Sequence, residues 1–371
     1  MHFVIFGLSI SSSWGNGHAT LWRGMLKAMT KRGHTVSFYE RDVPYYATTR
    51  DGWACPDGAA LYLYKSLHEV RSKAMQDLDS ADLALWTSYC PEGAAVSDMV
   101  LGSRAAIRGF YDLDTPVTLH ALGLGAKIDY LPADGLRECD LVLSYTGGHA
   151  IQELKSRLGA RRVAPLYGWF DPETHRPAPP MKEFRGALCY LGTFAADRQR
   201  ALQELFVKTA IRTPRDRFVL AGAQYPDNFP WQNNIYFVRH LSPTLHPAFF
   251  CSSRATLNIT RGSMAEYGYC PSGRLFEAAA CGAPILSDWW EGLEMFFTPE
   301  KEILRVESSD DVLHALALSD RELRNIGEAA RERAFEQHTA ASRLEELESI
   351  CETVLSGGKQ QPVFHGNAEV A

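Results

Sequence analysis

The chain has 371 residues, of which 46% are hydrophobic and 22% charged, and its formal net charge is −6. This length suits two domains, and the negative charge, with Lys and Arg scattered, argues against nucleic acid as a partner. No apolar run approaches the length of a membrane span, no signal peptide is evident, and eight widely spaced cysteines indicate free thiols, so we expect a cytoplasmic globular protein.

The N-terminal half alternates short apolar runs with amphipathic stretches. The runs are rich in β-branched and aromatic residues and span 2–7, 35–39, 61–64, 83–86, 107–111, 141–145 and 163–167. Helical stretches such as Thr20–Arg32 and His149–Leu158 lie between them. Apolar strands that alternate with helices predict a parallel sheet covered on both faces, and we assign this domain to residues 1–170.

A glycine-rich segment follows the first predicted strand. Its Gly15 and Gly17 permit positive φ or close approach of the backbone, and Asn16 and His18 add polar side chains. A dinucleotide fingerprint would need a third glycine at the position that Thr20 occupies, so the segment argues against a nicotinamide cofactor. His18, at the predicted helix start, is either a site residue or an ordinary exposed one.

Two aspartates follow the predicted strand at 107–111. Asp112 and Asp114 alternate along the chain, so an extended backbone would turn one toward the cleft and the other toward the supporting loop. The alternative is a plain turn, because Asp and Pro are both common there.

Four prolines within residues 171–180 interrupt the alternation and predict a semi-rigid linker, which we assign to residues 171–183. A second alternation fills residues 184–337. Its strands are expected at 187–191, 218–221, 235–238, 255–259, 284–287 and 303–306, and its helices at 198–211, 246–252 and 321–337. A last helix at 338–356 is long enough to cross back to the first domain, and residues 357–371 are expected to form a flexible tail.

Polar residues follow several predicted strands of the second domain, at the sheet edge where ligands of open α/β sheets bind. Gly192, Thr193 and Arg198 offer backbone N–H groups, a hydroxyl and a guanidinium to a diphosphate. Arg261, after the strand at 255–259, is a further phosphate candidate. Helix caps and surface arginines are the alternative interpretation.

The segment from Tyr269 to Asp288 is the most informative. Ser272 and Gly273 precede a short predicted helix whose N-terminus would carry unpaired N–H groups and partial positive charge, which suits phosphate. Arg274 and Glu277 lie on this helix, and the carboxylate could accept two hydrogen bonds from a ribose diol. A plain cap at Ser272 is the alternative, although Glu277 lies five residues on rather than three. The pattern indicates a nucleoside-diphosphate site.

The run Glu-Ala-Ala-Ala-Cys-Gly-Ala-Pro at 277–284 resembles the C-terminal signature of GT-B glycosyltransferases, and more narrowly that of the CgeB-like group. The resemblance extends through 257–261 and 288–293 and is strongest between residues 188 and 335. It implies an α/β protein with two Rossmann-like parallel-sheet domains facing a central cleft. A nucleotide sugar, with UDP the expected nucleotide, would bind the C-terminal domain, and an unidentified acceptor would bind the N-terminal one.

The resemblance also assigns roles. The loop of Gly15, Asn16 and Gly17 would lie under the sugar and acceptor, with Asp112 nearby and His18 at its end. Asp114 would be a general base or a carboxylate that orients the sugar. His240, after the strand at 235–238, would contact the nucleobase. No metal and no bound cofactor are expected, because an Asp-x-Asp pair holds Mg²⁺ in glycosyltransferases of a different architecture.

One departure leaves the stereochemical outcome open. Many retaining GT-B enzymes carry a glutamate where this chain has Tyr269. Either Trp289 or Trp290 could pack on a sugar face, the other being a core residue. Two other functions also stay open, namely a sugar-nucleotide epimerase of the same fold and a nucleotide-sugar-binding protein without catalysis. The oligomeric state is not indicated.

Overall fold

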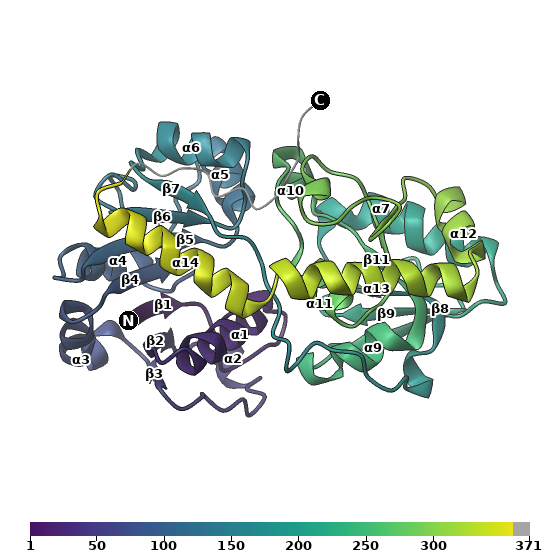
Figure 1. Cartoon of the computed structure of the whole chain (residues 1–371), viewed down its shortest axis with the longest axis horizontal. Helices are drawn as coiled ribbons and strands as arrows, with labels where there is room; N and C mark the ends of the chain where they lie inside the picture. The colour runs from purple at the N-terminus through teal and green to yellow at the C-terminus, as the bar shows by residue number, and fades with distance from the viewer. Residues whose placement is uncertain (359–371) are drawn as a thin grey trace.

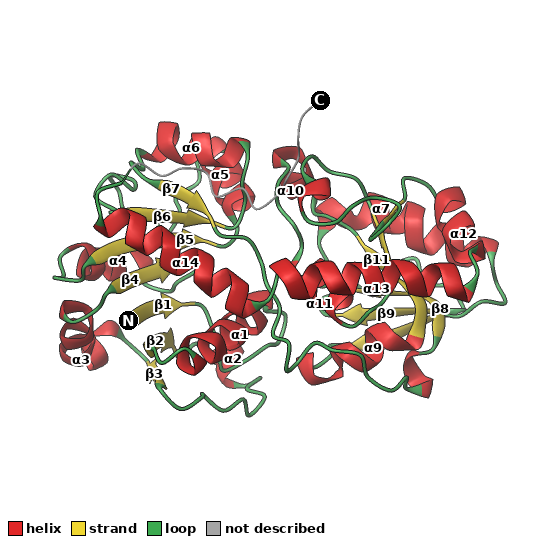
Figure 2. Cartoon of the chain, in the orientation of Figure 1, coloured by secondary structure: helices red, strands yellow, loops and turns green. Residues whose placement is uncertain are grey.

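The computed structural model describes residues 1–358, which form two α/β domains side by side (Figure 1). Both domains contain a parallel sheet with helices on its faces, as the alternation predicts (Figure 2). Apart from its first two residues, the tail expected at 357–371 lies outside the described residues. None of the helices within residues 1–358 is long and apolar enough to cross a membrane.

The N-terminal sheet has seven parallel strands in the order β3-β2-β1-β4-β5-β6-β7. Its strands are β1 (His2–Gly7), β2 (Thr35–Arg41), β3 (Ala59–Tyr64), β4 (Leu83–Thr87), β5 (Ile107–Asp112), β6 (Leu141–Ser144) and β7 (Val163–Pro165). Its helices are α1 (Gly17–Lys31), α2 (Pro44–Ala47), α3 (Leu67–Asp79), α4 (Gly93–Leu101), α5 (Thr115–Gly123) and α6 (His149–Leu158).

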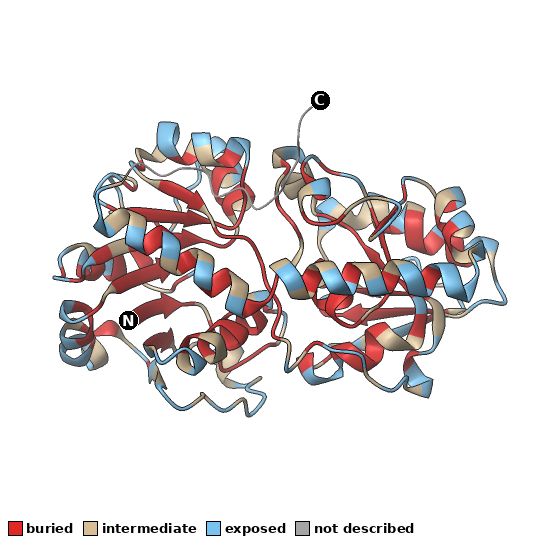
Figure 3. Cartoon of the chain, in the orientation of Figure 1, coloured by how far each residue is buried: buried red, intermediate tan, exposed pale blue. Residues whose placement is uncertain are grey.

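The apolar character of these strands follows from burial on both faces (Figure 3). Phe3 and Ile5 of β1 belong to a core on one face, together with residues of α1. Val4 and Phe6, which point the opposite way, belong to a second core that includes residues of α3 and α4. Because successive side chains of a strand alternate between faces, a strand covered on both faces is mostly apolar along its whole length.

The C-terminal sheet has six parallel strands in the order β10-β9-β8-β11-β12-β13. These are β8 (Gly186–Leu191), β9 (Phe218–Gly222), β10 (Ile235–Arg239), β11 (Ser253–Asn258), β12 (Ile285–Ser287) and β13 (Leu304–Arg305). The α-helices are α7 (Gln199–Leu202), α8 (Lys208–Arg212), α9 (His246–Ser252), α10 (Gly262–Tyr267), α11 (Gly273–Ala280), α12 (Ser309–Ala317) and α13 (Asp320–Gln337). Shorter turns are η1 (Lys182–Phe184), η2 (Ala196–Arg198), η3 (Gln203–Val207), η4 (Pro243–Leu245) and η5 (Leu293–Met295).

The chain crosses between the domains twice, and the two crossings are hydrogen bonded to each other. Phe170 N donates to the carbonyl of His338 at 3.1 Å, and Ala340 N donates to the carbonyl of Phe170 at 2.9 Å. The last helix, α14 (Ala340–Leu355), then lies across the N-terminal domain (Figure 1). Its Leu344 and Leu347 enter the core beside α1. Through these hydrogen bonds and the packing of α14, the end of the chain stabilises the contact between the two domains.

Candidate active site

An open pocket lies between the domains, at the carboxyl ends of both sheets. The loop after β1 forms one wall, and the loops after β8, β9 and β10, with the starts of α9 and α11, form the other. Seven of the residues expected from the sequence line it, namely Gly15, Asn16, Gly17, Gly192, Thr193, His240 and Arg274. The remaining wall is formed by Ser13, Thr20, Leu191, Gly222, Ala223, Leu241, Pro243 and His246.

A buried carboxylate holds the glycine-rich loop in place. Glu40, in β2, accepts hydrogen bonds from Ile10 N at 2.7 Å and Ser11 N at 3.0 Å. Asn16 caps α1 by accepting a bond from His18 N at 3.1 Å. Gly15 has a φ of +58°, and a side chain there would also crowd the hydroxyl of Tyr45. The loop therefore presents a fixed backbone surface to the pocket.

The structure brings His18 and Asp114 together. Nε2 of His18, in the first turn of α1, lies 2.7 Å from Oδ2 of Asp114, the residue before α5. A paired imidazole and carboxylate can move a proton, because the carboxylate fixes the ring and stabilises its protonated form. Neither residue lines the pocket itself, so the pair lies beside it on the N-terminal side.

Asp112 lies beneath the turn that carries Asp114, not at the pocket surface. Its side chain is 0% exposed. Oδ1 accepts hydrogen bonds from Asp114 N and from the hydroxyl of Thr118, both at 3.1 Å. Burial raises the pKa of Asp112 to about 7. Asp112 therefore supports the turn that carries Asp114.

Tyr89 completes this side of the cleft and was not predicted. It follows β4 with a φ of +58°, which is unusual for a bulky residue and is often found at functional sites. Its ring is 40% exposed and lies 6.1 Å from the ring of His18. A positive φ at a tyrosine leaves no mark in the sequence, so only the structure could identify it.

The expected diphosphate residues divide into two groups. Gly192 and Thr193 line the pocket, and a Cβ at Gly192 would lie 2.6 Å from the hydroxyl of Tyr190, so a side chain there would force Tyr190 to move. Arg198 instead donates to the carbonyl of Thr193 at 2.7 Å, and it does not line the pocket. Arg261 pairs with Asp197 at 3.2 Å and also lies outside the pocket. Both arginines therefore shape the loops rather than the pocket surface.

At the start of α11, one residue caps the helix and a different residue lines the pocket. Ser272 is the N-cap, and its hydroxyl accepts a bond from Arg274 N at 3.3 Å. Neither Ser272 nor Gly273 lines the pocket, whereas the side chain of Arg274 does. The guanidinium is therefore the group of α11 that a ligand would meet first.

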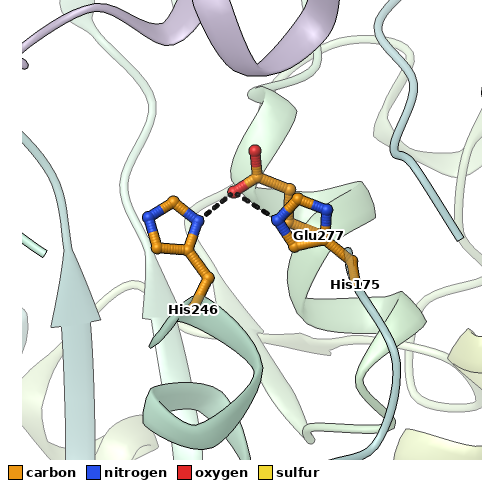
Figure 4. A group of neighbouring side chains, drawn as sticks. All are labelled: His175, His246 and Glu277. Carbon is orange, nitrogen blue, oxygen red and sulfur yellow. Dashed lines mark ion pairs between the residues drawn. The ribbon is translucent and has the colours of Figure 1, made fainter. Parts of the chain in front are cut away.

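Glu277 lies behind Arg274 rather than at the pocket surface. Its residue is 2% exposed, and Oε2 lies 2.5 Å from Nη1 of Arg274. Two imidazoles flank the same oxygen, with Nδ1 of His246 at 3.3 Å and Nε2 of His175 at 3.8 Å (Figure 4). Burial alone would raise the pKa of Glu277, but Arg274 and the imidazoles lower it below its ordinary value. The carboxylate is therefore charged.

His175, His246 and Glu277 are the one group among the described residues with the ligand types and spacing to hold a metal ion. The contact between Arg274 and Glu277 argues against an ion there. A guanidinium already occupies the carboxylate oxygen that an ion would need, and it would repel a second positive charge.

Two aromatic contacts join the domains across the cleft. Trp14, in the glycine-rich loop, packs on His240 with ring centroids 4.2 Å apart. Tyr269 has a φ of +45°, and its ring lies between Gly148 and Gly292, where a Cβ would come within 2.4 Å of ring atoms. Tyr269 thus packs between the two domains.

The two tryptophans after β12 lie away from the pocket. Trp290 is buried in the core of the C-terminal domain, and Trp289 is exposed beneath the guanidinium of Arg305. Neither lines the pocket.

Comparisons with known proteins agree with this architecture. Residues 198–349 match the protein-family model described as glycosyl transferase-like, and no curated protein sequence matches the chain. A sucrose-phosphate synthase from Thermosynechococcus elongatus is similar in structure, with 13% identity, a TM-score of 0.67, and coverage of 96% of this chain and 100% of that one. HepE of Anabaena in complex with UDP-glucose has 13% identity, a TM-score of 0.65, and coverage of 95% and 100%.

A third solved structure, an alpha-glucosyltransferase in complex with UDP-glucose and DNA containing an abasic site, has 13% identity and a TM-score of 0.68. It covers 95% of this chain and 99% of its own. At such low identity these likenesses establish the fold. The chain has the GT-B fold, with two parallel-sheet domains of seven and six strands, as the sequence signature predicts.

Proposed function

We propose that the chain is a glycosyltransferase that takes a sugar from a UDP-sugar and passes it to an acceptor held by the N-terminal domain. The observation that carries the proposal is one pocket bounded by Arg274 and the loop of Gly192 and Thr193 on one wall and by the glycine-rich loop on the other. The family match over residues 198–349 supports it, as do structural neighbours in complex with UDP-glucose. Within this fold, the signature at 277–284 favours the CgeB-like group.

The diphosphate would be stabilised without a metal. Thr193 and Arg274 line one pocket, whereas the N–H of Gly192 already donates to the carbonyl of Ala221 at 2.9 Å, so the backbone N–H of Thr193 and the guanidinium of Arg274 would be the donors. Preorganised donors of this kind stabilise the charge that develops on a departing diphosphate, which is the role a divalent ion has elsewhere. Arg274 is well suited because a guanidinium can donate two parallel hydrogen bonds to phosphate oxygens.

Glu277 would bind the ribose once the donor is in place. Arg274 now contacts both the pocket and Glu277, so a turn of its side chain toward the diphosphate would uncover the carboxylate. A charged carboxylate then accepts two hydrogen bonds from the diol. The order of events follows from the position of Glu277 behind Arg274.

His18 would act as the general base, with Asp114 orienting it. The 2.7 Å contact gives the imidazole a carboxylate partner, and an imidazole removes a hydroxyl proton near neutral pH more effectively than an isolated carboxylate. The half-exposed ring of Tyr89 forms an adjacent wall for the acceptor.

A thermal-shift screen over UDP, GDP, ADP and their sugars tests the donor assignment. A ligand at one hundred times its Kd stabilises a folded protein by about 2.7 kcal/mol, which is easily measured. The expected result is a shift with UDP and UDP-sugars, followed by transfer of labelled sugar to an acceptor. No shift with any nucleoside diphosphate would refute the proposal, and a new nucleotide sugar formed from the donor alone would indicate an epimerase.

A further inference from the structure

The carboxylate of Glu277 is flanked by two histidines that come from different parts of the chain. His246 is the first residue of α9, and His175 belongs to the proline-rich linker between the domains. Both nitrogens nearest to Glu277 face Oε2, and the other carboxylate oxygen points away from both rings (Figure 4). Oε2 thus lies between the two rings, while the other oxygen faces away from them.

The burial of these rings calls for an explanation. His175 is 0% exposed and His246 is 2% exposed. Three of their ring nitrogens have no hydrogen bond of good geometry among the described residues. These are Nδ1 and Nε2 of His175 and Nδ1 of His246. Buried polar atoms are rarely left without a partner, and those that are often belong to functional sites. Oε2 of Glu277, at 3.3 and 3.8 Å, is within a small shift of both rings.

The charge balance explains why two neutral rings are suited to this place. Burial lowers the pKa of His175 to about 4 and also lowers the pKa of His246, so both rings are uncharged at neutral pH. Arg274 already neutralises Glu277. When Arg274 turns to a diphosphate, the carboxylate loses its strongest donor, and neutral N–H groups can replace that contact without a new charge.

We propose that His175 and His246 are positioning residues, whose N–H groups hold Oε2 of Glu277 so that its other oxygen meets the ribose diol. This inference rests on the proposed function, since it assumes that the ligand of Glu277 is a nucleotide. It adds two residues to the donor site, one of them from the linker.

The linker itself is fixed in a way that sets the position of His175. His175 N donates to the carbonyl of Asp171 at 2.8 Å, and the carboxylate of Asp171 accepts bonds from Thr174 at 2.7 Å and from Lys27 at 2.6 Å. Lys27 lies on α1 of the N-terminal domain. The linker is therefore bonded at Asp171 to α1, the helix that follows the glycine-rich loop. Four residues further on, its His175 lies beside the carboxylate of Glu277.

The test compares UDP with 2′-deoxy-UDP, which lacks one hydroxyl of the diol. Calorimetry on the wild-type chain should show UDP binding tighter by about tenfold or more, as expected for one bond to a charged group. His175→Leu and His246→Leu should bring that ratio close to one. His175→Gln and His246→Asn place an amide nitrogen near the lost Nε2 and Nδ1, and should restore it. His314→Leu, at an exposed histidine of α12, is the control.

The outcomes separate this inference from the proposed function. A wild-type chain that binds no UDP refutes both. If UDP binds and Glu277→Ala loses the preference while His175→Leu and His246→Leu keep it, only the positioning role is refuted. If a leucine variant does not fold, the ratio of the affinities for UDP and 2′-deoxy-UDP is compared between His175→Gln and the shorter His175→Asn. Equal ratios in these two variants would refute the positioning role of His175. Stoichiometric zinc in the purified protein that His175→Gln removes would also refute it.

Discussion

Nε2 of His18 and Oδ2 of Asp114 lie 2.7 Å apart, although the residues are 96 positions apart in the chain. They meet because β1 and β5 both pair with β4 in one parallel sheet, so the helices that follow them begin at the same edge. Asp112, buried beneath the turn, accepts a bond from Asp114 N at 3.1 Å and fixes the carboxylate in place. The pair is therefore preorganised.

If His18 is the base and Asp114 orients it, His18→Ala and Asp114→Asn should each lower kcat by about 10²–10⁴. The double variant should be little worse than the poorer single one, because both changes disable the same proton transfer. The affinity for UDP should stay constant, since the donor contacts come from the other domain. Single-turnover rates and calorimetry on the same preparations provide the measurement.

Asp98→Asn, at an exposed residue of α4, is the control for the loss of a carboxylate. Additive losses in the double variant would show that the two residues act independently. If Asp114→Asn turns over at the wild-type rate, Asp114 is only a turn residue, and His18 would have to act alone.

Glu277→Ala should weaken UDP binding by about ten- to a hundredfold, because a hydrogen bond to a charged group contributes roughly 1.5–3 kcal/mol. The same variant releases Arg274 from its ion pair, which would partly offset the loss. Calorimetry measures the affinity, and a thermal melt shows whether the chain still folds. Glu328→Ala, on the exposed face of α13, should change neither. Unchanged UDP affinity in a folded Glu277→Ala chain would remove Glu277 from the donor site.

The strands and long helices could be predicted because the pattern of apolar residues along each element reflects which of its faces are buried. The continuous apolar run of β1 follows from burial on both faces of the sheet, and the bounds of α6 and α14 follow from the period of a helix that buries one face. The crossing of α14 back to the first domain also follows from the length of the helix and from the resemblance to a known fold.

The site was harder to predict because its contacts are not periodic. Glu277 was expected to face the ligand, but α11 buries Leu275, Phe276 and the alanines that follow Glu277, so Glu277 shares their buried surroundings. Its contact with Arg274 is an i, i+3 pair that helical spacing does predict. The contact with His175 could not be inferred, because a proline-rich linker has no repeating pattern from which to place a side chain.

If the backbone N–H of Thr193 and the guanidinium of Arg274 stabilise the diphosphate as proposed, sugar transfer should survive dialysis against EDTA, because both residues line the pocket. Initial rates before and after chelation, and with added Mg²⁺ or Mn²⁺, provide the measurement. Loss of activity that an added ion restores would mean that a cation is bound, and the carboxylates of Asp112 and Asp114 would then need to be tested as ligands.

The stability of the chain between pH 6.5 and 4.5 should depend on His175. Its pKa falls from 6.5 in the unfolded chain to about 4 in the folded one, so in this range the unfolded chain binds a proton that the folded chain does not. The free energy of unfolding is therefore lowered as the pH falls, by up to about 1.4 kcal/mol per pH unit for this one group. His175→Gln lacks the group, so its stability should fall less steeply with acid than that of the wild type.

Only the difference between the two chains is informative, because other groups titrate in the same range. Burial raises the pKa of Asp112 to about 7 and that of Asp288 to about 6, so both take up a proton in the folded state and oppose the effect of His175. Of the groups facing His175, Glu277 and Asp171 have lowered pKa values and stay charged, the charge of Arg274 lowers the pKa of His175, and His246 is present in both chains. Urea unfolding at several pH values measures the difference, and parallel curves for wild type and His175→Gln would show that His175 is not held neutral in the fold.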